Sequence, residues 1–420
     1  MLDARLIREE EQLVRKALSD RRQDLAVLDE FLEADGRWRA LTDEANALRK
    51  RRNEVAAEVP SLSEGEKAAR IDEMRSISQR IKEIDKELGV LNAKRDDCLL
   101  NFPNVPDPSV PVGDQDVGDV IVRAWGSERR FDFKPLPHWE IGERLDIIDF
   151  DRGAKVAGAG FYALKGDGAR LERAMINFML DLHHEQGYRE VFPPAIINRK
   201  SCIGTGQLPK MQDDMYWIER DDLWLNPTAE VPVTNLYADE ILEMSQLPIY
   251  HTAYLPSFRR EAGKHIETKG IARVHQFNKV ELVKFVVPES SPAELETLLA
   301  DAESVLQALK LPYRVKLLCT GSVGFHASKT YDLDAHSPGM EQWLEVSSCS
   351  DFKSFQARRA MIKFRREPHL KSEFIHTLNG SGVALARTFA AVLENCQNAD
   401  GTVTVPEVLR PYMKGTELLQ

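Results

Sequence analysis

Apolar residues recur every three or four positions through two long stretches of the first hundred residues, and this spacing constrains the fold more than any other feature. The first stretch spans residues 34–59 and the second spans 74–98, and both are nearly free of Gly and Pro. Such spacing is typical of amphipathic helices with coiled-coil seams. The break at 59–66 contains a Pro and a Gly, and Ser63 with Glu66 forms the sequence pattern of a capping box. We therefore predict an antiparallel helical hairpin.

The hairpin carries a basic run near its expected tip, made of Arg49, Lys50, Arg51 and Arg52. Periodicity alone fits a dimerisation coiled coil and an RNA-binding arm equally well. A basic run is usually a solvated helix face, but on such a hairpin it could also contact phosphates. The formal net charge of the chain is −11, which argues against nucleic-acid binding through bulk charge but not through a local patch.

Composition and cysteine usage indicate a soluble, intracellular class of protein. The chain has 420 residues, of which 43% are hydrophobic and 29% charged, so we expect a large core in two or three domains. The five cysteines include no Cys-x-x-Cys pair, which favours neither a disulfide framework nor a structural zinc site. No signal peptide and no apolar run of transmembrane length is visible. We expect a cytoplasmic protein with no membrane partner.

A proline-rich stretch divides the chain. Four prolines lie in residues 101–117, which is typical of an extended connector. We predict a helical hairpin over residues 1–103, a linker over 104–120 and a mixed domain over 121–420.

The mixed domain shows separate runs of β-rich and helical sequence. Helices are expected at 168–186 and 292–309, and β-rich runs occur at 251–258, 271–287, 312–319 and 342–349. The later runs are joined by turns and one helix rather than by alternating crossovers. This order favours an α+β fold with an antiparallel sheet flanked by helices.

The first candidate site residues are Arg259 and Glu261, two positions apart on an expected strand, where both would point to one face. Arg can hold a phosphate in a bidentate grip, and Glu can accept a hydrogen bond from an exocyclic amine. Taken alone, such a pair is more often an ordinary cross-strand salt bridge. Phe277 follows and offers an aromatic face on which a base could stack.

Two further segments carry charge in the second half of the chain. Glu281 lies in an expected strand, where burial is costly unless a cation such as a substrate ammonium pairs with it. Residues 379–382, Asn-Gly-Ser-Gly, are expected to lead into a helix that carries Arg387. Glycines allow close approach of the backbone to a ligand, and a helix N-terminus favours an anion. Arg387 could therefore reach a terminal phosphate, although most such stretches are simple caps.

Two polar segments remain ambiguous on local sequence. Thr228-Ala229-Glu230 supplies a hydroxyl and a carboxylate before a helix, but local sequence favours an N-cap threonine followed by an early acidic residue. The segment 345–348, Glu-Val-Ser-Ser, offers oxygen ligands suited to Mg²⁺ on a short strand, or polar residues of an edge strand facing water. His183, His184 and His265 lack partners at metal-ligand spacing, and we interpret them as surface or structural residues.

Taken together, these segments resemble a known family. Residues 258–281 and 377–388 resemble motifs 2 and 3 of class II aminoacyl-tRNA synthetases, and the details resemble seryl-tRNA synthetases. Residues 187–194 resemble motif 1, which usually forms a dimer interface, and 204–209 resemble the loop before the serine site. The resemblance covers almost the whole chain. It implies a class II catalytic domain, a homodimer, and ATP-dependent activation of L-serine followed by transfer to tRNA.

The resemblance also implies roles for individual residues. Arg259 would hold the α-phosphate of ATP and Arg387 the γ-phosphate, and these are the implied catalytic residues. The implied ATP-binding set is Arg259, Arg260, Glu261, Val274, Phe277, Glu345, Val346, Ser347, Ser348 and Arg387. The implied serine-binding set is Thr228, Ala229, Glu230, Arg259, Glu281, Asn379 and Ser381. The implied cofactors are ATP and Mg²⁺, with the metal at Glu345 and Ser348.

The implied nucleic-acid partner is serine tRNA, with selenocysteine tRNA as a second candidate acceptor. In the resembling family the helical arm grips the long variable arm of the tRNA across the dimer, which assigns that contact to the basic run at 49–52. One departure lies in the motif 2 loop at 261–270, which is one residue shorter than usual and carries Glu267 and Lys269 where Asp and Arg are common. We expect this departure to affect transfer to tRNA more than adenylate formation.

Two alternatives belong to other functional classes. One is a paralogue that activates serine for a carrier protein or a small molecule, and such relatives often lack the helical arm. The other is a non-catalytic tRNA-binding protein, which loss of Arg259, Glu281 or Arg387 would have indicated. All three residues and the arm are present.

Overall fold

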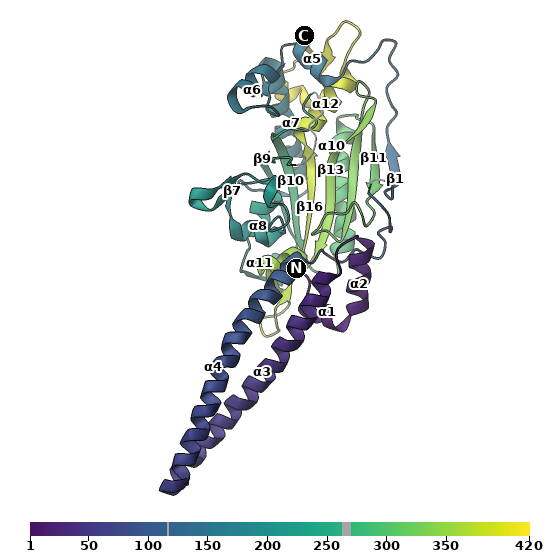
Figure 1. Ribbon diagram of the computed structural model, residues 1–420. Helices are drawn as coiled ribbons and strands as arrows, with labels where there is room; N and C mark the ends of the chain where they lie inside the picture. Colours follow the sequence, from purple (N-terminus) through teal and green to yellow (C-terminus); the bar gives the residue numbers. More distant parts are fainter. Residues whose placement is uncertain (116, 263–269) are drawn as a thin grey trace. The chain divides into compact units, whose positions relative to one another are not determined.

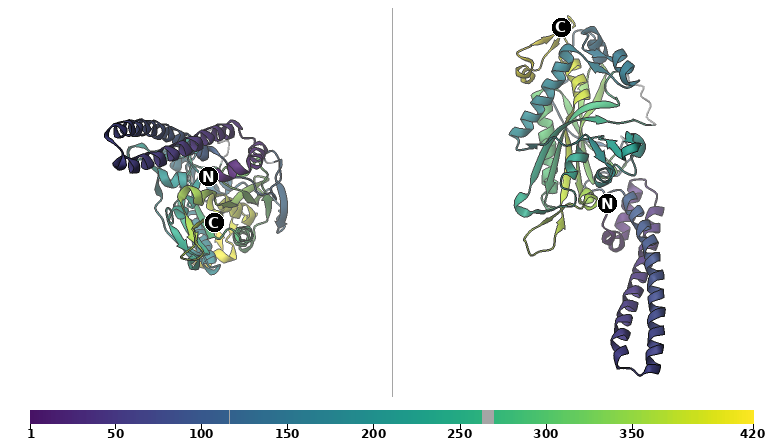
Figure 2. Two further views of the ribbon diagram at one scale, coloured as in Figure 1. Left: turned by 90° about the horizontal axis from the view of Figure 1, so that it is seen from below. Right: turned by 90° about the vertical axis from the view of Figure 1, so that its left-hand side faces the viewer.

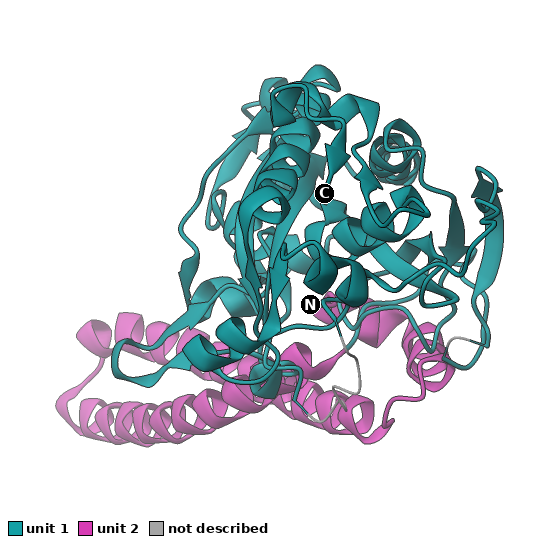
Figure 3. Cartoon of the chain, turned by 90° about the horizontal axis from the view of Figure 1, so that it is seen from above, with its two compact units in different colours: residues 1, 103–420 teal, residues 2–102 magenta. Residues whose placement is uncertain are grey.

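The chain forms two compact units. The computed structural model describes residues 1–115, 117–262 and 270–420. One unit comprises Leu2–Phe102, and the other comprises Met1 with Pro103–Gln420 (Figure 3). In the described residues no helix is long and apolar enough to cross a membrane.

The smaller unit is dominated by two long helices, α3 (Ala26–Glu58) and α4 (Glu64–Asn101). They lie side by side in every view of Figures 1 and 2, which confirms the predicted hairpin. The predicted capping box is present at the start of α4, where the Glu66 carboxylate accepts hydrogen bonds from the Ser63 backbone N–H and hydroxyl. Two short helices that the periodicity did not predict, α1 (Ala4–Glu9) and α2 (Glu11–Asp20), precede the hairpin.

The seam between α3 and α4 changes character along its length. Part of it is an apolar cluster that contains Leu41, Ala45 and Ile84. Nearer the end of α4, Arg95 occupies a seam position and pairs at 2.7 Å with Asp35, whose side chain is 1% exposed. The spacing therefore identified the face by which the two helices contact each other. At Arg95 on that face an ion pair replaces apolar packing.

The larger unit is built on an eight-stranded sheet. Its order is β1 (Val120–Trp125), β11 (Tyr313–Leu317), β12 (Lys329–Ser337), β13 (Gln342–Lys353), β16 (His376–Ala384), β10 (Gln276–Val286), β9 (Ile249–Phe258) and β4 (Arg189–Glu190). Every neighbouring pair is antiparallel except β4 with β9. The predicted α+β class with an antiparallel sheet is confirmed.

Helices α7 (Gly166–Glu185) and α10 (Ser291–Ala308) match the two predicted helices, and α12 (Leu385–Cys396) completes the main helical layer. Their apolar faces join those of the sheet in the main hydrophobic core. The shorter helices are α5 (His138–Arg144), α6 (Phe150–Ala157), α8 (Arg199–Thr205), α9 (Glu230–Asn235) and α11 (Phe355–Ala360).

Small sheets surround the main one. They are β2 (Ile148–Asp149) with β3 (Ala163–Leu164); β5 (Ile196–Asn198), β7 (Leu223–Leu225) and β6 (Trp217–Ile218); β15 (Glu373–Phe374), β14 (Lys363–Arg365) and β8 (Ile241–Glu243); and β17 (Val403–Thr404) with β18 (Leu418–Leu419).

Residues 379–382, which were expected to lead into a helix, lie in strand β16, and helix α12 follows that strand. The glycines on this strand pack against the helical layer. A Cβ atom on Gly380 would lie 2.9 Å from Cys349 Sγ and 3.2 Å from Leu298 of α10, and one on Gly382 would lie 2.4 Å from His183 of α7. The glycines thus permit close helix packing instead of close approach to a ligand.

The proline-rich segment interpreted as a linker belongs to the larger unit. Asn104 is buried, and its side-chain amide donates hydrogen bonds to the carbonyls of His326 (3.0 Å) and Phe352 (2.9 Å). Asp107 continues the contact through a backbone hydrogen bond to Ser328. These contacts fix the loop that carries His326 and the end of strand β13, both of which border the cavity described next.

Candidate active site

A cavity of about 530 Å³ opens on the sheet face opposite α7 and α10. It gathers most of the site residues that the sequence singled out, although they are spread over some 160 positions of the chain. The predicted residues that line it are Thr228, Glu230, Arg259, Glu261, Val274, Phe277, Glu345, Val346, Ser347, Ser348, Asn379, Ser381 and Arg387.

Three predicted residues do not line the cavity. Ala229 is buried in a hydrophobic cluster, and Glu281 lies completely buried beneath the cavity wall. Arg260 is exposed, and its guanidinium donates to the Asp213 carbonyl at 3.2 Å. His265, Glu267 and Lys269 lie outside the described residues.

Arg259 and Glu261 do not share a strand, which corrects the expected i, i+2 geometry. Strand β9 ends at Phe258, and Glu261 adopts a left-handed conformation with φ of 49°. Both side chains still reach the cavity. The Arg259 guanidinium donates to the Pro227 carbonyl at 3.2 Å and lies 5.1 Å above the ring of Phe277. The Arg259 guanidinium is thus fixed beside the aromatic face of Phe277 at this end of the cavity.

Arg387 lies in the first turn of α12, because strand β16 continues to Ala384 and the helix begins at Leu385. Its guanidinium donates to the carbonyls of Ala272 (3.0 Å) and Glu345 (2.7 Å). These backbone contacts fix the group, and the Glu345 carboxylate lies 3.6 Å from the same guanidinium. Arg259 and Arg387 therefore supply two positive groups to one cavity, which suits a polyanionic ligand.

A buried charge network surrounds Glu281. Lys279, two residues earlier on β10, places its ammonium 2.5 Å from the Glu281 carboxylate and 2.8 Å from the Thr228 hydroxyl. Thr228 in turn donates to Glu281 at 2.6 Å, and the Asn379 amide donates to it at 2.7 Å. The cation that compensates the buried Glu281 is therefore a protein side chain, whereas the sequence argument invoked a substrate ammonium.

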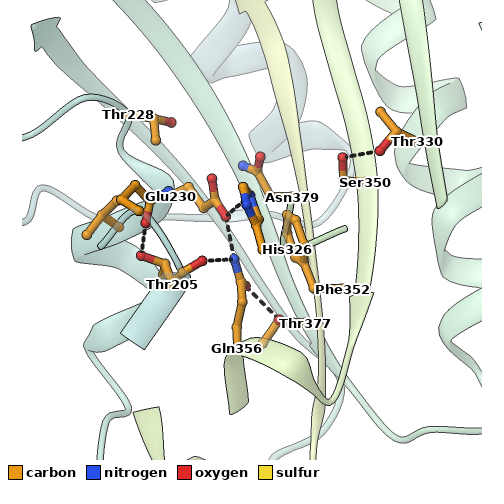
Figure 4. A network of polar contacts seen from close by, with 12 residues as sticks. Thr205, Thr228, Glu230, His326, Thr330, Ser350, Phe352, Gln356, Thr377 and Asn379 are labelled. Carbon is orange, nitrogen blue, oxygen red and sulfur yellow. Dashed lines mark hydrogen bonds and ion pairs between the residues drawn. The ribbon is translucent and has the colours of Figure 1, made fainter. Parts of the chain in front are cut away.

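Glu230 forms a second polar network, shown in Figure 4. Its carboxylate accepts a hydrogen bond of 2.5 Å from the Gln356 amide and lies 3.7 Å from Nε2 of His326. The Gln356 carbonyl accepts from the Thr377 hydroxyl. Burial, with the negative charge of Glu281 as the second cause, raises the pKa of Glu230 to about 7. This carboxyl group can therefore change its protonation near neutral pH.

Acidic and hydroxyl groups meet on β12 and β13. Asp332 lies opposite Ser348 in the register, and both line the cavity with Glu345. Burial and the neighbouring Glu345 raise the pKa of Asp332 well above its ordinary value. Oδ1 of Asp332 is buried, and none of the described residues offers it a hydrogen bond. Such a pair of carboxyl groups is suited to a cation.

The structure also decides between the local alternatives. Thr228 is not an N-cap, because helix α9 starts without a side-chain cap and the hydroxyl bonds Glu281 instead. Strand β13 is a long interior strand between β12 and β16, so Glu345 and Ser348 do not belong to an edge strand. His183 is buried and contacts Gln186 and the Gly382 carbonyl, in agreement with a structural role.

The sequence argument missed four cavity or network residues, which are Lys279, His326, Asp332 and Gln356. Lys279 shares a strand face with Glu281, and this spacing could have indicated it. Asp332 lies on a strand that was not predicted. His326 and Gln356 come from a loop and a helix distant in sequence, and no local pattern marks them.

Two family descriptions match the chain. Residues 1–106 match the seryl-tRNA synthetase N-terminal domain, and residues 216–396 match the tRNA synthetase class II core domain (G, H, P, S and T). The two matches follow the order of the helical hairpin and the sheet that carries the cavity.

Individual proteins agree with the family descriptions over the full length. A serine–tRNA ligase of Methanosarcina barkeri is 52% identical over 420 residues, covering 99% of this chain and 98% of the relative. The crystal structure of seryl-tRNA synthetase from Pyrococcus horikoshii complexed with ATP matches with a TM-score of 0.95 and 37% sequence identity. The match covers 100% of this chain and 99% of the Pyrococcus chain. The cytoplasmic serine–tRNA ligase of Naegleria fowleri in complex with AMP has a TM-score of 0.91 at 30% identity, with the same coverage. The chain therefore belongs to the seryl-tRNA synthetase family, whose members are class II aminoacyl-tRNA synthetases and act as serine–tRNA ligases.

Proposed function

We propose that the cavity binds ATP and L-serine together and that seryl-adenylate forms there before the seryl group passes to tRNA. The observation that carries the proposal is the union, in one cavity, of two fixed arginines with a network of buried carboxylates. The arginines suit a triphosphate, and the carboxylates suit the ammonium and hydroxyl of an amino acid. The Pyrococcus horikoshii relative complexed with ATP supports the nucleotide part.

For ATP, we assign the α-phosphate to Arg259 and the γ-phosphate to Arg387. The adenine ring stacks on Phe277, beside the Arg259 guanidinium, and Glu261 accepts a hydrogen bond from the exocyclic amine. Val274, Val346 and Ser347 complete the nucleotide side of the cavity.

For serine, we assign the ammonium to Thr228 on the cavity wall, with the Glu281 carboxylate that Thr228 contacts supplying the negative charge from beneath it, and the hydroxyl to Glu230. Asn379 and Ser381 border the same region from β16. Glu281 keeps only part of its hydrogen-bonding capacity for the substrate, because Lys279 already pairs with it. A site that hydrogen-bonds a hydroxyl rejects an analogue lacking it, such as alanine, by about 10⁴-fold.

The acidic pair on β12 and β13 fits Mg²⁺. Glu345 and Ser348 supply oxygen ligands, and the unpartnered Oδ1 of Asp332 adds a third. Among the described residues no group of three or more His, Cys, Asp and Glu forms a protein-only metal cage. This agrees with Mg²⁺, which is usually held by one or two carboxylates together with substrate phosphates. The ion would supply charge neutralisation and orientation at the triphosphate.

The chain's own residues act mainly by positioning. The serine carboxylate attacks the α-phosphorus of ATP in line, and pyrophosphate leaves. Arg259 lies where negative charge develops at the α-phosphate, and Arg387 orients the leaving pyrophosphate. Both guanidiniums are fixed by backbone carbonyls, so little reorganisation accompanies the reaction.

For tRNA, we assign the helical hairpin to the long variable arm of serine tRNA, in a homodimer whose interface includes residues 187–194. Arg49 and Arg51 already pair with Asp85 and Glu73 of α4. Lys50 is 81% exposed at its side chain, and we assign to it and Arg52 the main phosphate contacts of the basic run. The proposed role of the protein in protein synthesis supports a cytoplasmic location.

The test is serine-dependent ATP–pyrophosphate exchange. Arg259→Ala is expected to lower exchange by at least about 10³-fold, because it removes a group that acts on the reacting phosphate. Arg260→Ala is the matched control, since the neighbouring guanidinium lies outside the cavity, and it should retain exchange. Alanine, threonine and cysteine serve as substrate controls. Near-normal exchange by folded Arg259→Ala protein would refute the proposed site.

A further inference from the structure

The inner part of the cavity holds an imidazole that none of the assigned roles uses. His326 lines the cavity, and its Nε2 lies 3.7 Å from the Glu230 carboxylate. The His326 side chain is 17% exposed and that of Glu230 is 6% exposed. Figure 4 shows the carboxylate between the Gln356 amide and this imidazole. The carboxylate therefore has a neutral donor on one side and a titratable group on the other.

The imidazole is held in place from three directions. Its ring stacks on Phe352 with centroids 4.9 Å apart and an interplanar angle of 26°. The Asn104 side chain fixes the backbone carbonyls of both His326 and Phe352. Gly206 closes the third side, because a Cβ there would lie 3.1 Å from His326 Cβ. A ring packed this way has little freedom to turn away from Glu230.

The other charged groups that face Glu230 are engaged elsewhere. Glu281 repels it, whereas Lys279 and Arg259 attract it. The Lys279 ammonium lies at 2.5 Å from Glu281, and Arg259 donates to the Pro227 carbonyl. Among the described residues, the basic nitrogen within ion-pair distance of Glu230 is Nε2 of His326.

An ionised carboxylate is the better acceptor for a substrate hydroxyl, because charged acceptors form hydrogen bonds about twice as strong as neutral ones. Burial opposes that ionised form. A nearby imidazolium stabilises the ionised carboxylate. An imidazole becomes protonated as the pH falls, which is also the range in which the carboxylate tends to gain a proton.

We propose that His326 is a positioning residue of the serine pocket, which favours the ionised form of Glu230 and directs it at the substrate hydroxyl as the pH falls through neutrality. This inference rests on the proposed assignment of the serine hydroxyl to Glu230. His326 acts through Glu230 and has no part in the chemistry at the phosphate.

The test compares the wild-type enzyme with His326→Ala and His326→Gln in ATP–pyrophosphate exchange between pH 6 and pH 9. Gln fills the site and donates a hydrogen bond but cannot become charged. For both variants we expect the KM for serine to rise about tenfold at pH 6.5 and less than about twofold at pH 8.5, as a rise of one unit in the Glu230 pKa would produce. The kcat and the KM for ATP should change less than twofold.

Each outcome decides the question. A variant effect of equal size at all pH values would mean that the imidazole only packs, and it would overturn the proposal. Unchanged serine KM in both variants, or a loss in kcat, would also overturn it. Thermal unfolding of each variant confirms that the protein is folded. Wild-type enzyme without serine-dependent exchange would instead refute the proposed function, so the two failures are distinguishable.

Discussion

The helical hairpin and the cavity both contain many charged residues, yet they hold them in opposite ways. In the hairpin, Arg80 pairs with Glu44 at 2.8 Å, and both side chains are more than 40% exposed. In the sheet unit, Lys279 pairs with Glu281 at 2.5 Å, with 8% and 0% exposed. The distances are similar, but water screens the first pair and not the second. The comparison teaches that exposure, rather than contact distance, decides how much an ion pair affects the stability of the fold.

The largest expected effect comes from removing one partner of each pair. Lys279→Met leaves Glu281 buried without its cation and should lower the free energy of unfolding of the sheet unit by about 3–5 kcal/mol. Arg80→Met, the matched change in the hairpin, should cost less than about 1 kcal/mol. Urea unfolding measures both values. Equal losses would mean that the two pairs do not differ as their exposure indicates.

A second change removes the carboxyl group of Glu230, whose ionised form is disfavoured by burial. The pKa of Glu230 rises from 4.5 to about 7 in the folded protein, so the wild type loses stability as the pH rises between these values. Glu230→Gln removes that loss and should raise the free energy of unfolding at pH 8 by about 2–3 kcal/mol, with little change at pH 4.5. It should also weaken serine binding. Unfolding curves at the two pH values test the sign, with the exposed Glu44→Gln as control.

The hairpin also contains a buried charge, at Asp35. This residue tests whether the effect of a charge on stability depends on its burial or on the unit in which it lies. Asp35 is 1% exposed and pairs with Arg95 at 2.7 Å. Asp35→Asn should lower the free energy of unfolding of the hairpin by about 1.5–3 kcal/mol, the opposite sign to Glu230→Gln. The reason is that Asp35 pairs directly with a cation, whereas burial, with the negative charge of Glu281 as the second cause, opposes the ionised form of Glu230. Thermal unfolding followed by circular dichroism measures the change, and a stabilised variant would contradict the explanation.

The smallest effect on the fold is expected from the basic run, in which Lys50 is exposed and Arg52 is half-buried. Combining Lys50→Ala with Arg52→Ala should change the free energy of unfolding by less than about 0.5 kcal/mol, and exchange should be unaffected. The KM for tRNA should rise, most strongly at low salt, because phosphate contacts depend on ionic strength. Aminoacylation at two salt concentrations makes the measurement. An unchanged KM for tRNA would remove this basic run from the tRNA contact.

The sequence predicted the hairpin well because its information is local. Apolar spacing and the cap at Ser63 depend on residues three or four positions apart, and both are present in the structure. The sheet was predicted in class but not in all its strands. Residues 379–382 have the composition of a loop, yet they form part of β16 because helices pack closely against their glycines.

The same distinction applies to the site. Residues such as Arg259 and Arg387 could be named from short segments, and the cavity brings them together. His326, Asp332 and Gln356 could not be named, because their meaning depends on register and on neighbours far away in sequence. Local patterns therefore indicated the groups that can contact ligands, whereas the groups that tune them required three-dimensional structure.

Strand β16 has a consequence for how the enzyme can change over generations. Ser381 borders the cavity, while the glycines on either side of it contact α10 and α7 on the hidden face. Any side chain added at Gly380 or Gly382 would push a helix away and move Ser381 with the strand. Mutations far from the substrate can thus alter amino-acid selectivity, and a selection for altered specificity should sample the contacts of Leu298 and His183 as well as the cavity.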